Sequence, residues 1–514
     1  MKDLLTKRTI LLFSFAALAA YPMSAASCES LLMLKLPSAT VTVAEAVGAG
    51  AFALPVAANG KGKGKGAAAN YSDLPGFCRV RVVSKPSSDS NINIEYWLPV
   101  GASWNGNFLG TGNSGFSGAI STSDLVDGVR RHYAVASTDT GHEGGSASFA
   151  LNHPEKLIDF AYRAVHEMTV LGKLVSKGYY ESDVRKSYWN GCSAGGRQGL
   201  KAVQMYPADF DAVVAGSPGV MWTGRSTQAV WIGQQTHKDA ESALPQAKFA
   251  VVHAAVLAAC DAKDGAKDGI IDDPRKCSFD PATIQCQTAA DAPDCLTAPQ
   301  VATVKRIYSD VKNPRTGEVY FPGHEPGSEN GWNTMAGANV FGTGPDLFKY
   351  IVFNNADWDY KTLNYDADMT AAMKAGAAMD AMDPKLKPFY DRGGKIIQYH
   401  GWADPQISPR SSVMYYTKVA EANGGIAKVQ QNHLLYMIPG MAHCGGGDAT
   451  STFDMLKAME AWVATNKAPD HIDASRTRNG QVDRTRPLCA YPATAQYKGS
   501  GSVDEAANFS CKQP

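Results

Sequence analysis

The stretch that decides the fold is Asn190-Gly191-Cys192-Ser193-Ala194-Gly195-Gly196-Arg197. It contains the pattern Gly-x-Ser-x-Gly, with a short strand-like run before it and a helical pattern after it. A strand-to-helix turn this tight needs small residues two positions before and after the serine, where Gly191 and Gly195 stand. The alternative is a plain glycine-rich turn, but the flanking runs favour a nucleophile elbow. Ser193 then projects from the turn, and the Ala194 N–H at the helix start is one oxyanion donor.

Strand-like and helical runs alternate on both sides of this elbow. The strand-like runs are 80–83, 92–97, 133–137, 187–190, 212–215, 395–399 and 433–438, and the helical runs are 160–177 and 195–205. This alternation predicts a mostly parallel sheet with helices on both faces. With the elbow, it predicts the α/β-hydrolase fold. Residues 218–388 break the rhythm, so we expect a catalytic domain from 27–217 and 389–514 and a large lid domain at 218–388, between nucleophile and acid.

The elbow requires two further catalytic groups. A serine hydroxyl is a weak nucleophile until a histidine, oriented by a carboxylate, takes its proton. In this fold the order along the chain is Ser, acid, His, each on a loop after a strand. Asp404 follows the strand 395–399 and His443 follows the strand 433–438, so we expect Ser193, Asp404 and His443 to form the triad. His142 and His400 are alternative bases, and each equally suits a structural role.

Two of the ten cysteines flank the expected triad. Cys192 directly precedes Ser193, and Cys444 directly follows His443. If the serine and histidine touch, these cysteines come within bridging range, because a disulfide needs Cα atoms roughly 4.4–6.8 Å apart. The alternative is two unrelated buried cysteines, which leaves their positions unexplained.

The amino terminus has the pattern of a signal peptide. Lys2, Lys7 and Arg8 precede an apolar run at 10–20 and a small-residue cleavage site at 24–26. We expect residues 1–26 to be removed and the mature protein to be secreted or periplasmic, where disulfides form. A membrane anchor is the alternative, but the apolar run is too short. Residues 45–70 are glycine-rich and predict a flexible surface loop.

The charge and the hydropathy of the chain limit the classes of partner that it is expected to bind. The chain has 49 Lys+Arg and 49 Asp+Glu, a net charge of zero, and no long basic run, so nucleic acid is excluded as an expected partner. After the amino terminus no apolar stretch approaches the eighteen or so residues of a membrane span, and no membrane contact is expected in the mature form.

Cys-Ser, Asp and His-Cys in this order, with a long insertion before the aspartate, resemble the tannase and feruloyl esterase family, which includes the hydrolase of the terephthalate monoester from polyester. The resemblance runs from about Cys28 to Cys511. It also covers Trp104-Asn105-Gly106, Gly216-Ser217-Pro218-Gly219, Asp391-Arg392-Gly393-Gly394-Lys395 and Tyr497-Lys498-Gly499-Ser500-Gly501. The implied disulfides are Cys192–Cys444, Cys28–Cys78, Cys260–Cys277, Cys286–Cys295 and Cys489–Cys511. The implied second oxyanion donor is the N–H of Gly115, in a glycine-rich segment that permits close backbone approach.

An acidic run in the insertion suggests a metal. Residues 260–270 present three carboxylates at close, irregular spacing with intervening glycines, and hard oxygen ligands suit Ca²⁺. The pattern is not an EF-hand. The resemblance implies a structural calcium bound by the side chains of Asp261, Asp264 and Asp268 and the carbonyls of Ala266 and Ile270. From spacing alone, an acidic turn balanced by lysines fits equally well.

The insertion is rich in aromatic residues, namely Trp332, Phe341, Phe348, Tyr350, Phe353, Trp358, Tyr360 and Tyr365. We expect most of them to pack the lid and one or two to face a flat phenolic ring. No arginine lies between Arg315 and Arg392, so this part of the lid offers no guanidinium to a terminal carboxylate. That disfavours a terephthalate-monoester hydrolase.

These observations predict a carboxylic ester hydrolase that cleaves small phenolic esters of aromatic hydroxy acids, of the feruloyl esterase kind, through an acyl-enzyme. The nearest alternative is a tannase acting on galloyl esters, followed by the terephthalate-monoester hydrolase. A peptidase uses the same triad, but nothing in the sequence provides for an amine leaving group. From another class, an inactive calcium-binding secreted module keeps the fold, and the intact set of Ser193, Asp404 and His443 argues against it.

Overall fold

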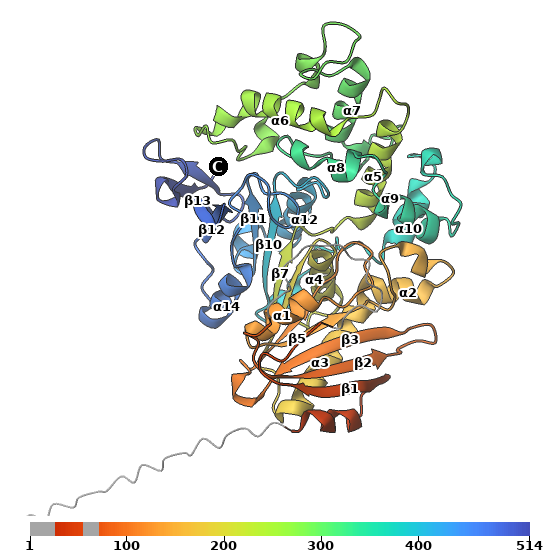
Figure 1. Ribbon diagram of the computed structural model, residues 1–514, viewed down its shortest axis with the longest axis vertical. Coiled ribbons are helices and arrows are strands. Elements are labelled where there is room, and N and C mark those ends of the chain that lie inside the picture. The colour runs from red at the N-terminus through yellow and green to blue at the C-terminus, as the bar shows by residue number, and fades with distance from the viewer. Residues whose placement is uncertain (1–25, 55–70) are drawn as a thin grey trace, which may run out of the picture.

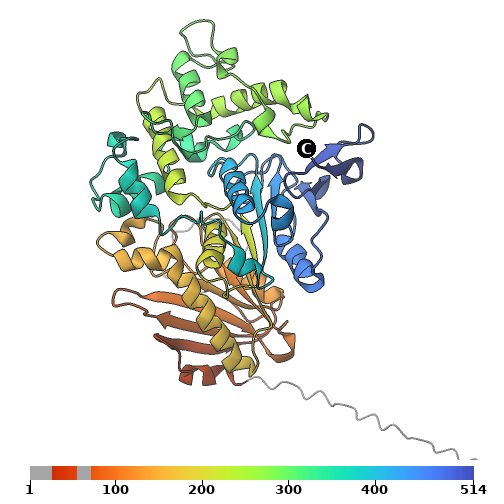
Figure 2. The ribbon, with the colours of Figure 1, turned by 180° about the vertical axis from the view of Figure 1, so that it is seen from behind.

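The computed structural model describes residues 26–54 and 71–514. The predicted signal peptide, except its last residue, and most of the glycine-rich run lie outside the described residues. Figures 1 and 2 show the described chain from two opposite sides, with a layered sheet domain and a helical region above it. Among the described residues, no helix is both long and apolar enough to cross a membrane.

A nine-stranded sheet forms the centre, in the order β1-β2-β3-β5-β4-β6-β7-β10-β11. The strands from β5 to β11 in this order are parallel, and β1, β2, β3 and β5 pair antiparallel. Their bounds are β1 Ala39–Val47, β2 Phe77–Ser84, β3 Ile92–Pro99, β4 Asn107–Thr111, β5 Ala134–Thr138, β6 Lys186–Cys192, β7 Ala212–Gly216, β10 Lys395–Gly401 and β11 His433–Ile438. The predicted α/β-hydrolase fold is confirmed, and the segments before and after the insertion share one sheet.

Two of these strands were not predicted from the sequence. β1 lies at one edge of the sheet, and β4 lies near its centre between β5 and β6. β4 is short, and a side chain on its Gly110 would meet the ring of Trp189 at 3.0 Å. This crowding explains why the residue is glycine. A glycine inside a strand weakens the apolar pattern from which strands are predicted.

Helices cover both faces of the sheet. On one face α3 (Ala164–Tyr180), α4 (Ala194–Met205) and α12 (Arg410–Ala422) contribute buried side chains such as Met168, Leu200 and Tyr416. On the other face α1 (Thr122–Arg130) and α14 (Met455–Thr465) contribute Val129 and Met459. The shorter helices of this domain are α2 Pro154–Ile158, α11 Lys387–Tyr390 and α13 Ile426–Val429. A sheet buried on both faces explains the continuous apolar strands in the sequence.

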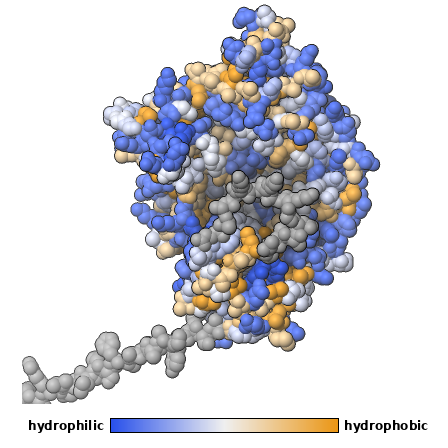
Figure 3. Space-filling view, in the orientation of Figure 1, coloured by the Kyte–Doolittle hydropathy of each residue, from blue (hydrophilic) through white to orange (hydrophobic). Residues whose placement is uncertain are grey.

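The insertion, residues 218–388, contributes no strand to the central sheet and lies above it in Figure 1. Its elements are α5 Trp222–Thr236, α6 Gln246–Cys260, α7 Ala298–Tyr308, β8 Val311–Lys312, β9 Val319–Phe321, α8 Asn333–Ala336, α9 Thr343–Asp346, the π-helical turn Leu347–Val352 and α10 Met369–Gly376. The chain ends in two hairpins, β12 Ile472–Arg478 with β13 Gln481–Leu488 and β14 Thr494–Tyr497 with β15 Phe509–Lys512. On the face drawn in Figure 3, hydrophilic residues dominate these upper parts, with apolar residues scattered among them.

Candidate active site

The loop between β6 and α4 has the geometry of a nucleophile elbow. Ser193 has φ 63° and ψ −121°, a conformation that non-glycine residues rarely adopt. Its N–H donates to the carbonyl of Gly216 at the end of β7, at 2.9 Å. A Cβ on Gly191 would approach the backbone of Gly195 to 2.7 Å, so a larger residue does not fit without displacing the turn. The small residues on either side of the serine are therefore a steric requirement.

Asp404 and His443 meet at the same edge of the sheet. His443 Nδ1 lies 2.7 Å from Asp404 Oδ2. The other carboxylate oxygen, Oδ1, accepts the N–H groups of Gln406 at 2.8 Å and Ile407 at 3.0 Å. Burial alone raises the pKa of Asp404, but the His443 charge and the hydrogen bonds from His400 and His443 outweigh it and hold that pKa well below its usual range. The carboxylate is thus ionised and fixed in orientation.

His400 is a second histidine on the same carboxylate oxygen. Its Nε2 lies 3.1 Å from Asp404 Oδ2, and its Nδ1 lies 2.7 Å from Ser412 Oγ. The ring is completely buried. His142, the other alternative base, is held elsewhere by the carbonyl of Phe116 at 2.8 Å. Sequence reasoning named His400 as a rival base and missed it as a partner of the acid.

The predicted disulfide between Cys192 and Cys444 is confirmed, with Cα atoms 6.0 Å apart. Ser193 and His443 are each about 3.8 Å along the chain from a bridged cysteine, so the two side chains start from neighbouring backbone positions. In the described part of the chain, however, no hydrogen bond joins Ser193 Oγ to His443. The other four predicted bridges are also confirmed: Cys28–Cys78, Cys260–Cys277, Cys286–Cys295 and Cys489–Cys511.

Two backbone amides are free to bind an oxyanion. Ala194 is the first residue of α4, where an N–H has no partner within the helix. Gly115 has φ +51°, a conformation that favours glycine. Among the described residues, neither N–H donates to a protein acceptor. The Gly115 segment is tied to the elbow because the N–H of Gly195 donates to the carbonyl of Asn113 at 2.8 Å.

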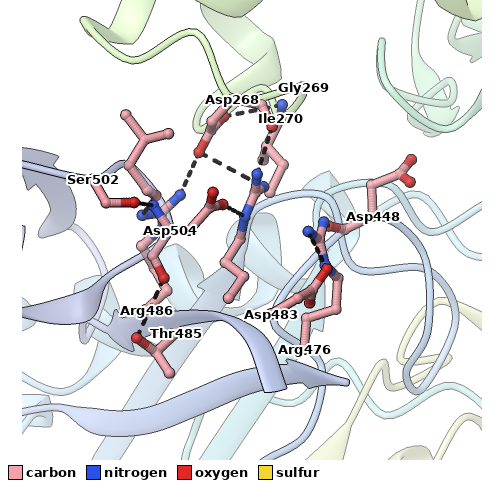
Figure 4. A network of polar contacts seen from close by, with 12 residues as sticks. Asp268, Gly269, Ile270, Asp448, Arg476, Asp483, Thr485, Arg486, Ser502 and Asp504 are labelled. Carbon is pink, nitrogen blue, oxygen red and sulfur yellow. Dashed lines mark hydrogen bonds and ion pairs between the residues drawn. The ribbon is translucent and has the colours of Figure 1, made fainter. Parts of the chain in front are cut away.

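The acidic loop at 260–272 is held together by its own backbone amides. Asp261 Oδ1 accepts the N–H groups of Asp268 and Gly269, both at 3.1 Å. Asp264 Oδ1 accepts the N–H of Ala266 at 2.9 Å. Figure 4 shows Asp268 facing Arg486 on β13, in the β12–β13 hairpin, so the loop is anchored there as well.

Four carboxylates crowd this loop. Burial, and then the charges of Asp264 and Asp268, raise the pKa of Asp272 to about 8. Burial and the neighbouring aspartates raise the pKa of Asp264 to about 6 in spite of its backbone hydrogen bonds. Within residues 26–54 and 71–514, no three His, Cys, Asp or Glu side chains are arranged as a formed metal site. The donor chemistry nonetheless suits Ca²⁺, because the hard oxygens of four carboxylates share one turn, and among these four only Asp268 forms an ion pair within the described residues, with Arg484 and Arg486.

Several aromatic residues of the insertion at 218–388 pack against one another, as expected. Phe348 stacks on Trp358 with ring centroids 5.2 Å apart, and Phe353 lies 5.3 Å from Trp358. Phe348 also belongs to an apolar cluster that includes Ala194 and Trp222. The apolar core of the insertion therefore continues to Ala194, the residue after Ser193.

A family model described as tannase and feruloyl esterase matches residues 78–512. The chain belongs to the tannase and feruloyl esterase family. This family member is 38% identical to an uncharacterized esterase of Xanthomonas campestris pv. campestris, over 98% of this chain and 94% of that protein. It is 32% identical to feruloyl esterase B of Aspergillus niger, over 84% of this chain and 86% of that protein. The membership makes it a carboxylic ester hydrolase with a small-molecule ester as substrate.

Solved structures agree with this membership. Feruloyl esterase B from Aspergillus oryzae superposes with a TM-score of 0.87 at 32% identity, covering 95% of this chain and 99% of that one. The tannin acyl hydrolase from Aspergillus niger shares the fold, with a TM-score of 0.75 at 22% identity and coverage of 93% and 92%.

Proposed function

We propose that this family member is an exported serine esterase that hydrolyses esters of aromatic hydroxy acids, of the feruloyl kind, with Ser193, His443 and Asp404 as its triad. The observation that carries the proposal is the 2.7 Å contact between His443 Nδ1 and Asp404 Oδ2 beside a disulfide that joins the histidine loop to the elbow. The resemblance in sequence to feruloyl esterase B proteins supports the choice of acyl group.

In the proposed mechanism, His443 Nε2 takes the proton of Ser193 while Oγ attacks the ester carbonyl. Asp404 holds the tautomer with the proton on Nδ1 and stabilises the imidazolium that forms. The N–H groups of Ala194 and Gly115 stabilise the negative carbonyl oxygen. His443 then protonates the leaving alcohol, and water releases the acyl-enzyme by the same steps. Ser193 Oγ and the His443 imidazole share no hydrogen bond in the described part of this structure, so they have to move closer before the proton passes between them. Such catalytic hydrogen bonds are often long in the absence of substrate.

The loop at 260–272 is the proposed calcium site, with Asp261, Asp264 and Asp268 as side-chain ligands and Ala266 and Ile270 as carbonyl ligands. It belongs to the lid and contacts the C-terminal hairpin, so the ion's role is structural. Ca²⁺ would neutralise the carboxylates that now repel one another. Export is supported by five disulfides, which form outside the reducing cytosol.

The triad proposal is tested with Ser193→Ala. We expect this variant to lose on the order of 10⁶-fold in kcat on p-nitrophenyl acetate and to keep the wild-type melting temperature. Rates on methyl ferulate, methyl gallate and monomethyl terephthalate, measured side by side, then separate the feruloyl esterase from the tannase and the terephthalate-monoester hydrolase. Wild-type turnover by Ser193→Ala would refute the assignment.

A further inference from the structure

Unpaired polar atoms are concentrated at the start of α5, above the elbow. Twelve buried side-chain nitrogen or oxygen atoms of the described residues lack a hydrogen-bond partner, and six of them belong to α5 or to His324. They are Trp222 Nε1, Arg225 Nε, Ser226 Oγ, Gln228 Oε1 and both ring nitrogens of His324. Buried polar atoms are normally paired, so such a concentration calls for an explanation.

Arg225 is the charged member of this group. It is the only charged residue in α5 and is 5% exposed. Its Nη1 donates to Thr343 Oγ1, and its Cζ lies 4.4 Å from the ring centroid of Phe341. In the described chain no carboxylate forms an ion pair with it. Burial lowers its pKa to about 10, opposed by the charge of Asp404, so the guanidinium is cationic at neutral pH.

Arg197 shows what a structural buried arginine looks like in the same molecule. It too is fully buried and lies near aromatic rings, at 5.3 Å from Phe160 and 5.2 Å from Trp222. Its Nε is unpaired like that of Arg225, but its Nη1 donates to the carbonyls of Ala161 at 2.9 Å and Met379 at 3.1 Å. Arg225 has one neutral hydroxyl and a ring face in place of these acceptors.

Arg225 lies close to the proposed catalytic residues. The methyl group of Thr343 lies 3.9 Å from the place where a Cβ on Gly115 would stand, so the residue that holds Arg225 also borders the proposed oxyanion loop. The charge of Asp404 acts on both Arg225 and His324. The guanidinium therefore lies one residue away from the proposed oxyanion loop, through Thr343, and within range of the charge of Asp404.

We propose that Arg225 determines substrate specificity by binding a carboxylate that the ester carries in addition to its scissile bond. The planar guanidinium, with a free Nε–H, matches a carboxylate, and the N–H groups of Trp222 and His324 are further donors nearby. The substrate class is an aromatic ester that is a monoanion, with the carboxylate on the acyl or on the alcohol part. This inference rests on the proposed esterase function.

The test compares matched pairs of esters in wild type and Arg225→Gln. Monomethyl and dimethyl terephthalate differ by a carboxylate on the acyl side, and chlorogenate and its methyl ester differ by one on the alcohol side. We expect the ratio of kcat/KM for the anionic over the neutral member to fall roughly 10- to 100-fold in Arg225→Gln, mainly through KM, for one of the two pairs. That pair identifies the side that carries the carboxylate.

Arg315→Gln is the matched control, because Arg315 is an exposed lid arginine paired with Asp366 at 2.9 Å. It removes the same charge and should leave both ratios at the wild-type value. An equal loss on anionic and neutral esters in Arg225→Gln would overturn the proposal, since it would mean that the cation acts on the triad as a whole. If Arg225→Gln does not fold, Thr343→Val replaces it, and an unchanged ratio there would count against the proposal.

Direct binding separates this proposal from the esterase proposal. In Ser193→Ala, calorimetry with monomethyl and dimethyl terephthalate, and with chlorogenate and its methyl ester, measures recognition without turnover. We expect the anionic member of at least one pair to bind more tightly, and the added Arg225→Gln change to remove the difference. Equal binding within both pairs refutes carboxylate recognition, whereas selective binding with no ester cleavage by wild type refutes only the esterase proposal.

Discussion

Asp404 and the aspartates of the loop at 260–272 have opposite electrostatic settings. Asp404 is completely buried, yet histidines and two backbone amides surround it, and its pKa is held well below the usual range. In the loop at 260–272 four carboxylates lie close together and only Asp268 pairs with arginines, so burial and then the charges of Asp264 and Asp268 raise the pKa of Asp272 to about 8. Burial disfavours the charged carboxylate in both places, so the neighbouring charges and hydrogen-bond donors decide whether the pKa is lowered or raised. Asp404 has its partners in the protein, whereas the proposed calcium ion would supply a partner for the carboxylates of the crowded loop.

The largest expected effect comes from removing the charge at the first site. Asp404→Asn should lower kcat by about 10⁴-fold, because an amide no longer selects the His443 tautomer. Steady-state rates on p-nitrophenyl acetate measure this. Asp380→Asn is the matched control: Asp380 is also deeply placed, but it bonds to Thr223 at 3.0 Å and to neither active-site histidine. A comparable loss in both variants would show that any buried charge matters equally.

At the second site, Ca²⁺ should stabilise the protein by about 4 kcal/mol when its concentration is 1,000 times its dissociation constant. In a protein of this size we expect a melting temperature on the order of 5 °C higher than in EDTA. Differential scanning calorimetry measures the shift, and Asp264→Asn should abolish most of it. Asp291→Asn, at a half-exposed lid carboxylate paired with Lys248, should keep it. A melting temperature lowered by EDTA and not restored by Ca²⁺ would contradict the assignment.

His433 extends the comparison to a buried base with neutral partners. It is completely buried between Gln398 and Tyr390, and burial lowers its pKa to about 3. An unfolded histidine takes up a proton near pH 6.5. Between these values the unfolded state binds more protons, so the free energy of unfolding falls as the pH is lowered through this window.

From pH 7 to 4.5 we expect His433 to account for about 2–3 kcal/mol of that fall. Guanidinium denaturation at both pH values measures it. His433→Gln should flatten the dependence, and His471→Gln, at an exposed histidine, should leave it unchanged. An equally steep dependence in His433→Gln would show that the buried ring is not the cause.

The smallest expected effect concerns the second histidine on Asp404. His400→Leu should lower kcat roughly 10- to 100-fold with little change in KM, because it removes a hydrogen bond to a charged, correctly oriented acid. Rates are normalised to folded protein by circular dichroism. His433→Leu is the matched control, since it removes another fully buried ring on the neighbouring strand. Similar losses in both would make His400 a packing residue.

Sequence reasoning predicted the fold and the loops of the proposed triad because local patterns encode them. The glycines around Ser193 are needed by a turn that closes on itself, and Asp404 and His443 follow strands that the apolar runs mark clearly. Reasoning along the chain did not find β4 or the contact between His400 and Asp404, since both depend on packing between distant segments. Arg225 was not predicted for a different reason: it lies in α5, outside the segment between Arg315 and Arg392 that lacks arginine. The sequence feature that could have indicated Arg225 is that it is the single charged residue in the otherwise neutral helix α5.

The covalent link at Cys192 and Cys444 spans 252 positions and encloses the whole lid together with the acid loop. Maturation of the proposed hydrolytic centre is therefore an oxidative event as well as a folding event. A copy made in a thiol-reducing compartment lacks this tether between the proposed nucleophile and the proposed base. Its catalytic yield then depends on the oxidant it meets, and the choice of production host becomes part of the chemistry.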